Sequence, residues 1–451
     1  NDEWRVTVPL ERLGVYEYKA VAWIDRFGTW RHEVTKKFEA GQPIHSELLE
    51  GAAMVAETAR QKTIPPEEQT VLTRASVVMA DANLPEADRY AWVHQDALTR
   101  AMADHAPRKS LAESVRVGRV SVERERARFS SWYELFPRSC SPNPGVHGRF
   151  DDVIATLPRI ASMGFDVIYL PPIHPIGTSF RKGRNNALQA EPGDVGSPWA
   201  IGSPEGGHDA IHPELGTVED FARLVAAARD QGLEIALDIA IQCSPNHPYV
   251  QSHPQWFRHR PDGSIKYAEN PPKKYQDIYP LDFECDDWRA LWEEMRRVFL
   301  VWVERGVKIF RVDNPHTKPF AFWEWLIAEV RKVEPETIFL AEAFTRPKPM
   351  ANLAKRGFTQ SYSYFTWRNT KADLTEFLTE LTRGDWVEFY RPNFFANTPD
   401  ILNEYLQHGG RPATMIRLIL AATLGTNYGI YGPVFERCEV TPVRPGSEEY
   451  L

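Results

Sequence analysis

Residues 307–313 read Val307-Lys308-Ile309-Phe310-Arg311-Val312-Asp313. This short, mostly apolar run ends with the oppositely charged side chains of Arg311 and Asp313. A bounded run of this length is typical of a strand buried in a parallel sheet. The segment before it, from Asp287, has apolar residues at helical spacing, which predicts an amphipathic helix. That stripe comprises Trp288, Leu291, Trp292, Met295, Phe299 and Trp302.

The same alternation of helix and strand continues in both directions along the chain. Thr217-Val218-Glu219-Asp220 resembles a capping box, so a helix is expected to begin there and to stop near Gly232. Eight strand-like runs with mostly helix-length connections predict a (β/α)₈ barrel. The expected strands cover 132–136, 167–170, 233–239, 307–312, 338–343, 362–365, 386–390 and 427–431.

Composition narrows the class of protein. The 451 residues are 43% hydrophobic, 25% charged and 12% aromatic, which are globular values and exclude a disordered or coiled-coil chain. The sequence contains no uninterrupted run of ~18 apolar residues, so no membrane-spanning helix is predicted. A net charge of −8 argues against a nucleic-acid partner. The four cysteines form no CxxC pair, which favours a reducing, cytoplasmic compartment and no metal knuckle.

Changes in composition and in the periodicity of apolar residues along the chain predict three domains or subdomains. Residues 1–43 alternate like strands and suggest part of a β-sandwich, while 44–125 suggest an inserted helical bundle beginning with helix formers near Ser46. The barrel is expected over 126–451, with a polar, Pro-rich B subdomain at about 242–286. The absence of an initial Met suggests a trimmed chain.

Acidic residues cluster at the expected strand ends, where barrels of this type carry their active sites. Asp313 is at the end of strand four, Glu342 is at the end of strand five and Asp400 follows strand seven. Asp209 lies in the loop after strand two, and Asp238 is at the end of strand three. Any one of them alone is better explained as a helix cap or an ion-pair partner. Five on one face favour a catalytic centre.

Arg311 and Asp313 share one face of their strand because alternate residues point the same way. A neighbouring guanidinium favours an ionised carboxylate, as a nucleophile requires. A less compensated Glu342 can serve as acid and base. Two such carboxyl groups are the equipment of retaining glycosyl transfer.

At these residues the chain resembles the α-amylase superfamily of glycoside hydrolases and transglycosidases. Phe310-Arg311-Val312-Asp313 is similar to the superfamily's nucleophile motif, which implies Asp313 as nucleophile, with Arg311 orienting it. The resemblance likewise implies Glu342 as general acid/base and Asp400 as the carboxylate that stabilises the transition state.

Departures from the superfamily point to one branch. Asp238-Ile239-Ala240-Ile241-Gln242-Cys243 replaces the usual Asp-x-x-x-Asn-His, which puts a calcium ligand in doubt, and Pro399 stands before Asp400. With residues 270–279 and Asp313-Asn314-Pro315-His316, the chain resembles the α-1,4-glucan:maltose-1-phosphate maltosyltransferases.

This resemblance implies transfer of maltosyl from α-maltose 1-phosphate to an α-1,4-glucan, without a cofactor, in a cytoplasmic homodimer that takes part in α-glucan biosynthesis. It also implies a C-terminal β domain, for which no residues remain. The donor site is expected to include Lys182, Gln242, Asp277, Asn314, Lys274 and Tyr275.

Simpler explanations stand beside these assignments. Lys182 and Lys274 lie in basic runs that could be solvated, and Trp199, Tyr249, Trp256 and Tyr279 could be core residues rather than sugar platforms. His208, His212 and His316 lack metal-ligand spacing, so no metal is expected. The nearest rival function is an amylase-like hydrolase or a trehalose synthase-like isomerase. A carbohydrate-binding protein without catalysis is the rival from another class.

Overall fold

A computed structural model describes residues 3–451 and divides into two compact units. One is a helical unit formed by Val15–Ser121, and the other is a larger unit formed by the residues up to Gly14 together with Val122–Leu451.

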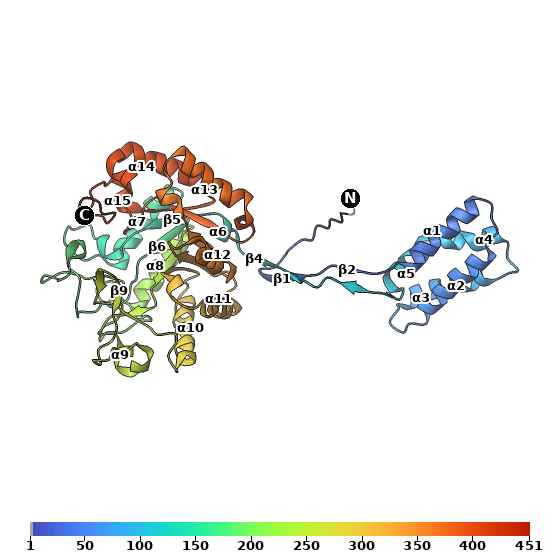
Figure 1. Cartoon of the computed structure of the whole chain (residues 1–451), viewed down its shortest axis with the longest axis horizontal. Helices are drawn as coiled ribbons and strands as arrows, with labels where there is room; N and C mark the ends of the chain where they lie inside the picture. Colours follow the sequence, from blue (N-terminus) through green and yellow to red (C-terminus); the bar gives the residue numbers. More distant parts are fainter. Residues whose placement is uncertain (1–2) are drawn as a thin grey trace. The chain divides into compact units, whose positions relative to one another are not determined.

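The helical unit is a small bundle with its own core (Figure 1). Its helices are α1 Arg26–Glu39, α2 His45–Ala59, α3 Pro66–Ala80, α4 Glu86–Tyr90 and α5 Asp96–His105. Trp30, Leu48 and Leu72 are among its buried residues. Two short two-stranded sheets pair β1 Gly14–Tyr18 with β4 Gly118–Val122, and β2 Val21–Ala22 with β3 Ala112–Glu113.

The expectation that residues 1–43 form a β domain is wrong over Arg26–Glu39, which is helix α1. The side chain of Asp25 caps this helix by accepting a hydrogen bond from Gly28 N at 2.7 Å. Phe27, Trp30 and Val34 face the core at helical spacing. The alternation before Trp23 does not extend into this stripe.

The larger unit contains a closed barrel of eight parallel strands, as predicted (Figure 1). In chain order the strands are β5 Ser130–Glu134, β6 Val167–Leu170, β7 Glu234–Ile239, β12 Ile309–Asp313, β13 Ile338–Glu342, β14 Gln360–Tyr362, β15 Pro392–Phe395 and β16 Asn427–Tyr431.

Connections between the strands carry helices. The longer ones are α7 Phe150–Ser162, α8 Val218–Asp230, α10 Trp288–Glu304, α11 Phe320–Val333, α12 Pro347–Lys355, α13 Lys371–Arg383 and α14 Glu404–Leu424. The short α6 Glu125–Arg128 precedes β5, and the short α15 Gly432–Glu436 follows β16. The capping box of Thr217 and Asp220 at the start of α8 is present as predicted. Leu291, Met295, Phe299 and Trp302 of α10 are buried in the core.

The seventh strand differs from its expected position. Residues Asp385–Glu388 form a short 3₁₀ helix, and the strand is Pro392–Phe395. Proline has no N–H to donate, but it is tolerated at the first residue of a strand. Side chains on a 3₁₀ helix repeat every third residue, and Trp386 and Phe389 are accordingly half-buried while Val387 and Glu388 between them are exposed.

Between β7 and α10 lies the expected long insertion, which has only short elements. These are β8 Gln242–Cys243, α9 Pro248–Ser252, β9 Ala268–Asn270, β10 Lys273–Tyr275 and β11 Tyr279–Pro280. β9 and β10 form a hairpin, and β11 pairs with β8. The insertion therefore returns to the barrel at Gln242.

A polar network closes the N-terminal end of the barrel around Gln360. Its amide nitrogen donates to Ser130 Oγ at 3.0 Å, to Asn427 Oδ1 at 3.0 Å and to Ala127 O at 3.2 Å. Its amide oxygen accepts from Asn393 Nδ2 at 3.1 Å. All of these groups are buried, so each hydrogen bond compensates a desolvated polar atom.

We expect Gln360→Ala to lower the free energy of unfolding by about 3 kcal/mol, because it leaves several buried polar groups unpaired. Urea unfolding followed by tryptophan fluorescence measures this change. The matched control is Gln231→Ala on the exposed end of α8, with an expected effect within about 0.5 kcal/mol. Equal effects at the two positions would contradict the network's role.

Candidate active site

Strand register gathers the predicted carboxylates at the C-terminal end of the barrel. Arg311 on β12 lies opposite Asp238 on β7, and Asp313 lies opposite Glu342 on β13. Ile309, two residues before Arg311, belongs to the cluster that fills the barrel interior. Because strand side chains alternate, Arg311 and Asp313 also point inward.

Arg311 connects these carboxylates. Its Nη1 donates to Asp313 Oδ1 at 2.8 Å and to Asp238 Oδ2 at 3.0 Å, and its Nη2 lies 3.8 Å from Glu342 Oε2. The arginine side chain is 7% exposed, so these charges interact with little screening by water. The guanidinium thereby stabilises the negative charge of Asp313, as a nucleophile needs.

Glu342 has the environment of a general acid/base. Burial raises its pKa to about 7; Arg311 opposes this rise and Asp313 adds to it. Its Oε2 also accepts a hydrogen bond from Asn314 N at 3.1 Å. A pKa near neutrality lets one group donate a proton in one step and accept a proton in the next.

Asn314 joins the two carboxylates. Its Nδ2 donates to Asp313 Oδ2 at 3.3 Å, while its backbone N–H serves Glu342. The residue has a left-handed backbone with φ 42°, which asparagine tolerates better than most residues. This backbone conformation directs both the N–H and the side-chain amide of Asn314 toward the two carboxylates. The residue is otherwise exposed to solvent.

Asp400 lies on the loop after β15 and is exposed to solvent. The protein that surrounds it raises its pKa; Arg311 opposes this and Asp313 adds to it. Asp400 therefore interacts electrostatically with Arg311 and Asp313 but forms no ion pair with Arg311. Such a carboxylate is free to contact a ligand.

Gln242 is linked to Asp238 through hydrogen bonds of Trp199. Its Nε2 donates to Trp199 O at 3.3 Å, and Trp199 Nε1 donates to Asp238 Oδ2 at 3.2 Å. Tyr169 donates to the same oxygen at 2.6 Å. Burial raises the pKa of Asp238 to about 7, against the opposing effect of Arg311.

A second group contains the other donor-site candidates. Lys182 is 8% exposed, and its Nζ reaches Lys274 O at 3.5 Å and lies 5.8 Å from the ring centre of Tyr275. Burial raises the pKa of Asp277, and the charge of Lys182 partly opposes this rise. Lys182 is therefore a buried cation rather than a solvated loop residue.

Within the hairpin, Lys274 contributes its backbone carbonyl while its side chain is exposed. Lys274 lies opposite Glu269, which pairs with Arg260 at 3.9 Å. Lys273 alternates to the face of Tyr275, pairs with Glu449 at 3.3 Å and interacts electrostatically with Asp400. Lys273 is not among the donor-site residues predicted from the sequence, although strand alternation with Tyr275 would have singled it out.

Lys318 was also missed. It follows Asp313 by five residues, and its Nζ donates to Thr317 Oγ1 at 2.8 Å. Burial lowers its pKa to about 8, while Asp313 and Glu342 act in the opposite direction. A spacing of five residues across a 3₁₀ turn gives no periodic signal that would place this ammonium at the site.

His208 belongs to a buried cluster with His247 and Cys243 that has the residue types of a metal site. Tyr249 N donates to His247 Nδ1, so the neutral ring carries its proton on Nε2 and donates to His208 Nδ1 at 3.1 Å. His208 then donates from Nε2 to Ala240 O at 2.9 Å. Hydrogen bonds already use all four ring nitrogens, so this cluster does not fit a metal.

His212, half-buried, forms a second such group with His147 and Glu214 on the loops that precede α7 and α8. His316 is close to the catalytic group, where burial lowers its pKa. Neither places a metal ligand among Asp313, Glu342 and Asp400.

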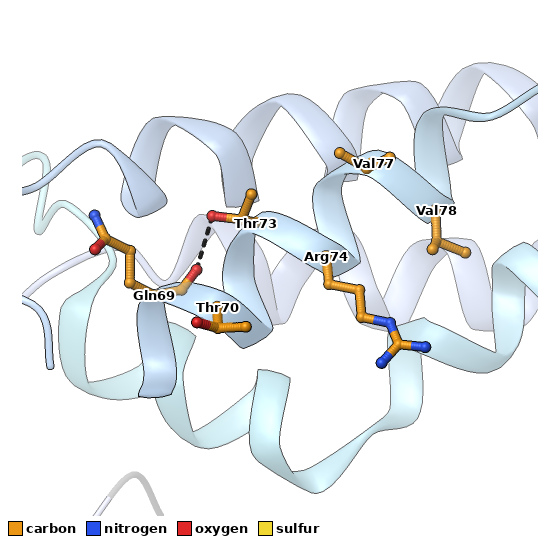
Figure 2. Close-up of a pocket in the computed structure, with 6 residues that line it drawn as sticks. All are labelled: Gln69, Thr70, Thr73, Arg74, Val77 and Val78. Carbon is orange, nitrogen blue, oxygen red and sulfur yellow. Dashed lines mark hydrogen bonds between the residues drawn. The ribbon is translucent and has the colours of Figure 1, made fainter. Parts of the chain in front are cut away.

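The helical unit has a depression along α3, lined by six residues (Figure 2). Thr73 donates there to Gln69 O at 2.8 Å, and Val77 is 63% exposed. The lining has no carboxylate or nucleophilic pair, so the barrel end remains the candidate active site. The lining consists of Gln69, Thr70, Thr73, Arg74, Val77 and Val78.

Comparisons with known proteins decide the family. The family model of α-1,4-glucan:maltose-1-phosphate maltosyltransferase, domain N/S, matches residues 1–124. The maltosyltransferase of Chlorobaculum tepidum is 54% identical over the whole chain and that of Methylacidiphilum infernorum 52%; the chain covers 67% of each relative. The chain belongs to the α-1,4-glucan:maltose-1-phosphate maltosyltransferases.

A solved structure shares the fold of this maltosyltransferase chain. An α-amylase from Lactobacillus plantarum matches 69% of this chain and 72% of its own with a TM-score of 0.53, at 24% sequence identity. Such a likeness shows the shared barrel fold. In the described part of the chain, we find no helix with the length and apolar character of a membrane span.

We expect Lys318→Met to lower kcat/KM of the maltosyltransferase about tenfold, ~1.4 kcal/mol, because it removes a partly desolvated cation beside both carboxylates. The pKa of Lys318 is about 8, so the wild-type ammonium loses its charge as pH rises through 8. The defect should therefore shrink at higher pH. Steady-state kinetics at several pH values measure it, with Lys371→Met on the exposed start of α13 as the control. A defect that does not change with pH would contradict a role for the charge.

Proposed function

We propose that the chain carries out retaining transfer of a maltosyl unit from α-maltose 1-phosphate to the non-reducing end of an α-1,4-glucan, in α-glucan biosynthesis. The observation that carries this proposal is the pair Asp313 and Glu342 on adjacent strands, joined by Arg311, in a member of this family. Neighbouring strands are ~4.8 Å apart. This spacing supports the short carboxyl separation of retaining enzymes.

In the first half-reaction, Asp313 attacks the anomeric carbon and the bond from that carbon to the phosphate oxygen breaks. The phosphate leaves with the bonding electron pair, and Glu342 can supply a proton to it. A β-maltosyl ester on Asp313 results. Asn314 can hydrogen-bond the phosphate because it lies between the two carboxylates.

In the second half-reaction, the 4-hydroxyl of the glucan attacks the same carbon and displaces Asp313. Glu342 accepts the hydroxyl proton, which its pKa of about 7 allows. Two inversions at one carbon give net retention. Asp400, which is exposed to solvent and lies within range of Arg311, is suited to bind sugar hydroxyls and stabilise the distorted ring.

The donor is bound, in this proposal, by the second group of residues. Lys182 and Tyr275 offer a buried cation and a phenol to the sugar phosphate, and Asp277 and Gln242 offer acceptors and donors to the maltosyl hydroxyls. Phosphate carries two charges near neutral pH, so a cationic pocket separates this function from that of a plain amylase.

The direct test mixes maltose 1-phosphate with a short maltooligosaccharide and follows phosphate release and glucan mass together. Phosphate release with products that grow by two glucoses would support the transferase. Shortened glucans without phosphate release would favour an amylase-like hydrolase, and interconversion of maltose and trehalose would favour an isomerase. Binding of maltooligosaccharide without turnover of any donor would favour the carbohydrate-binding alternative.

Asp313→Ala should abolish phosphate release, by at least about a thousandfold, while leaving calorimetric binding of maltose 1-phosphate measurable, because only the nucleophile is removed. Asp230→Ala at the exposed end of α8 is the matched control and should behave like wild type. Wild-type phosphate release from Asp313→Ala would overturn the assignment of the nucleophile.

The two hairpin lysines can be separated by experiment. Both lysines are candidates to bind the phosphate, and strand alternation favours Lys273 over Lys274 because Lys273 shares a face with Tyr275. Lys273→Ala should weaken binding of maltose 1-phosphate about tenfold more than binding of maltose. Lys274→Ala should weaken both equally or not at all, and the reverse result would restore Lys274.

The assembly and compartment also belong to the proposal. A homodimer through the N-terminal β and helical portions is our expectation from the family, and sedimentation velocity tests it. A reducing cytoplasm is supported by the four cysteines, which are all free.

A further inference from the structure

Glu134 is a buried carboxyl group that the mechanism above does not use. It is the last residue of β5, level with Tyr169 on β6 and with Tyr431 on β16. Trp132, two residues earlier, belongs to the cluster inside the barrel, so Glu134 points into the same interior. It is 1% exposed and lies at the end of the barrel that carries Arg311, Asp313 and Glu342.

Glu134 has no cation of its own in the described part of the chain. The hydrogen bonds of the nearest guanidinium, Arg311, go to Asp238 and Asp313, and its closest further carboxylate is Glu342. Glu134 Oε2 is buried without a hydrogen-bond partner among residues 3–451. An ionised carboxylate at such a place would carry an uncompensated desolvation cost.

The groups around Glu134 come from every neighbouring strand, and most are acidic or phenolic. Burial raises the pKa of Glu134 well above its usual value; Arg311 opposes this, while Asp238, Asp400 and Glu342 raise it further. Tyr362, whose hydroxyl is likewise buried without a partner, and the phenols of Tyr169 and Tyr431 complete the surroundings.

We propose that Glu134 is a positioning residue of the active site, held as an uncharged carboxylic acid inside the barrel, and that its lack of charge reserves Arg311 for the nucleophile. This inference rests on the proposed function for its consequence, although the protonation state itself does not. Four carboxyl groups, Glu134, Asp238, Asp313 and Glu342, share the one guanidinium described above.

The consequence follows from this charge balance. With Glu134 neutral, the positive charge of Arg311 compensates Asp313 and Asp238, and Glu342 keeps a pKa suited to proton transfer. An ionised Glu134 would compete for Arg311 and raise the pKa of Glu342 by charge repulsion. A neutral acid also keeps an O–H donor inside the barrel, which an apolar side chain of the same size would not supply.

Infrared spectroscopy of the chain tests the protonation state without any need for activity. The carbonyl stretch of a protonated carboxyl group is distinct from the bands of a carboxylate. At pH 7 the difference between wild type and Glu134→Gln should contain one protonated-carboxyl band, which persists when the pH is raised to about 9. The same difference for Glu342→Gln should lose its band over this range, because the pKa of Glu342 is about 7. Carboxylate bands alone in the Glu134→Gln difference would overturn the proposal.

The pH profile of phosphate release tests the functional consequence. If Glu134 is neutral, Glu134→Gln exchanges one uncharged group for another, so the midpoint assigned to Glu342 should stay within about 0.3 pH unit. Removing an ionised carboxylate would instead move that midpoint about one unit toward acid. Glu134→Leu, which lacks any polar group, should have a kcat at least about tenfold below that of Glu134→Gln.

These readouts separate the possible failures. Equal kcat values for the Gln and Leu variants would show that Glu134 does not position the site. Absence of phosphate release from wild type would refute the proposed function but leave the infrared result intact. Circular dichroism and thermal unfolding of each variant show that it is folded before it is compared.

Discussion

The guanidinium of Arg311 is the interaction on which the candidate active site depends. It is buried, and it donates from a single nitrogen to both Asp313 and Asp238. Without this cation, several carboxyl groups would lie together in a poorly hydrated barrel end, where repulsion and desolvation favour protonation. One buried cation therefore contacts Asp313 and lies near Glu342, the two carboxyl groups on which the proposed chemistry depends. Arg311 lies 2.8 Å from Asp313 and 3.8 Å from Glu342, and burial raises the pKa of Glu342 to about 7 against the effect of this cation.

Parallel pairing makes this arrangement possible. Each strand delivers its final inward residue to the same rim, so Asp238, Arg311, Asp313 and Glu342 meet although they are far apart along the chain. The opposite end of the barrel is closed by the network of Gln360, which includes no residue of the candidate site. Stability and chemistry are thus assigned to opposite ends of the same strands.

The sequence predicts the barrel well because buried parallel strands are short apolar runs between helices. The structure has eight barrel strands, although the sixth and seventh begin two and six residues away from the expected positions. It fails where one local pattern imitates another. The aromatic segment before Pro392 resembles a strand but forms a 3₁₀ turn, and Phe27, Trp30 and Val34 form a helical stripe that the preceding alternation obscures. The positions of Asp313, Glu342 and Asp400 could be anticipated from strand ends. Their environments could not, since burial and hydrogen bonding bring together residues from different strands and loops, as Asn314 and Glu342 show.

The residues that sequence reasoning missed share a physical reason. Lys273, Lys318 and Glu134 gain their significance from the direction of a side chain, and direction is decided by tertiary structure. Lys273 and Lys274 are chemically identical neighbours, yet one shares a face with Tyr275 and the other shares a face with Glu269. Glu134 resembles an ordinary strand-end acid until its burial is known. An acid with a bonded cation can remain charged in the interior, whereas an acid without one is more stable when neutral. Burial raises the pKa of Asp238 to about 7 although Arg311 donates a hydrogen bond to it. Among residues 3–451 Glu134 Oε2 has no hydrogen-bond partner, so less compensates its burial.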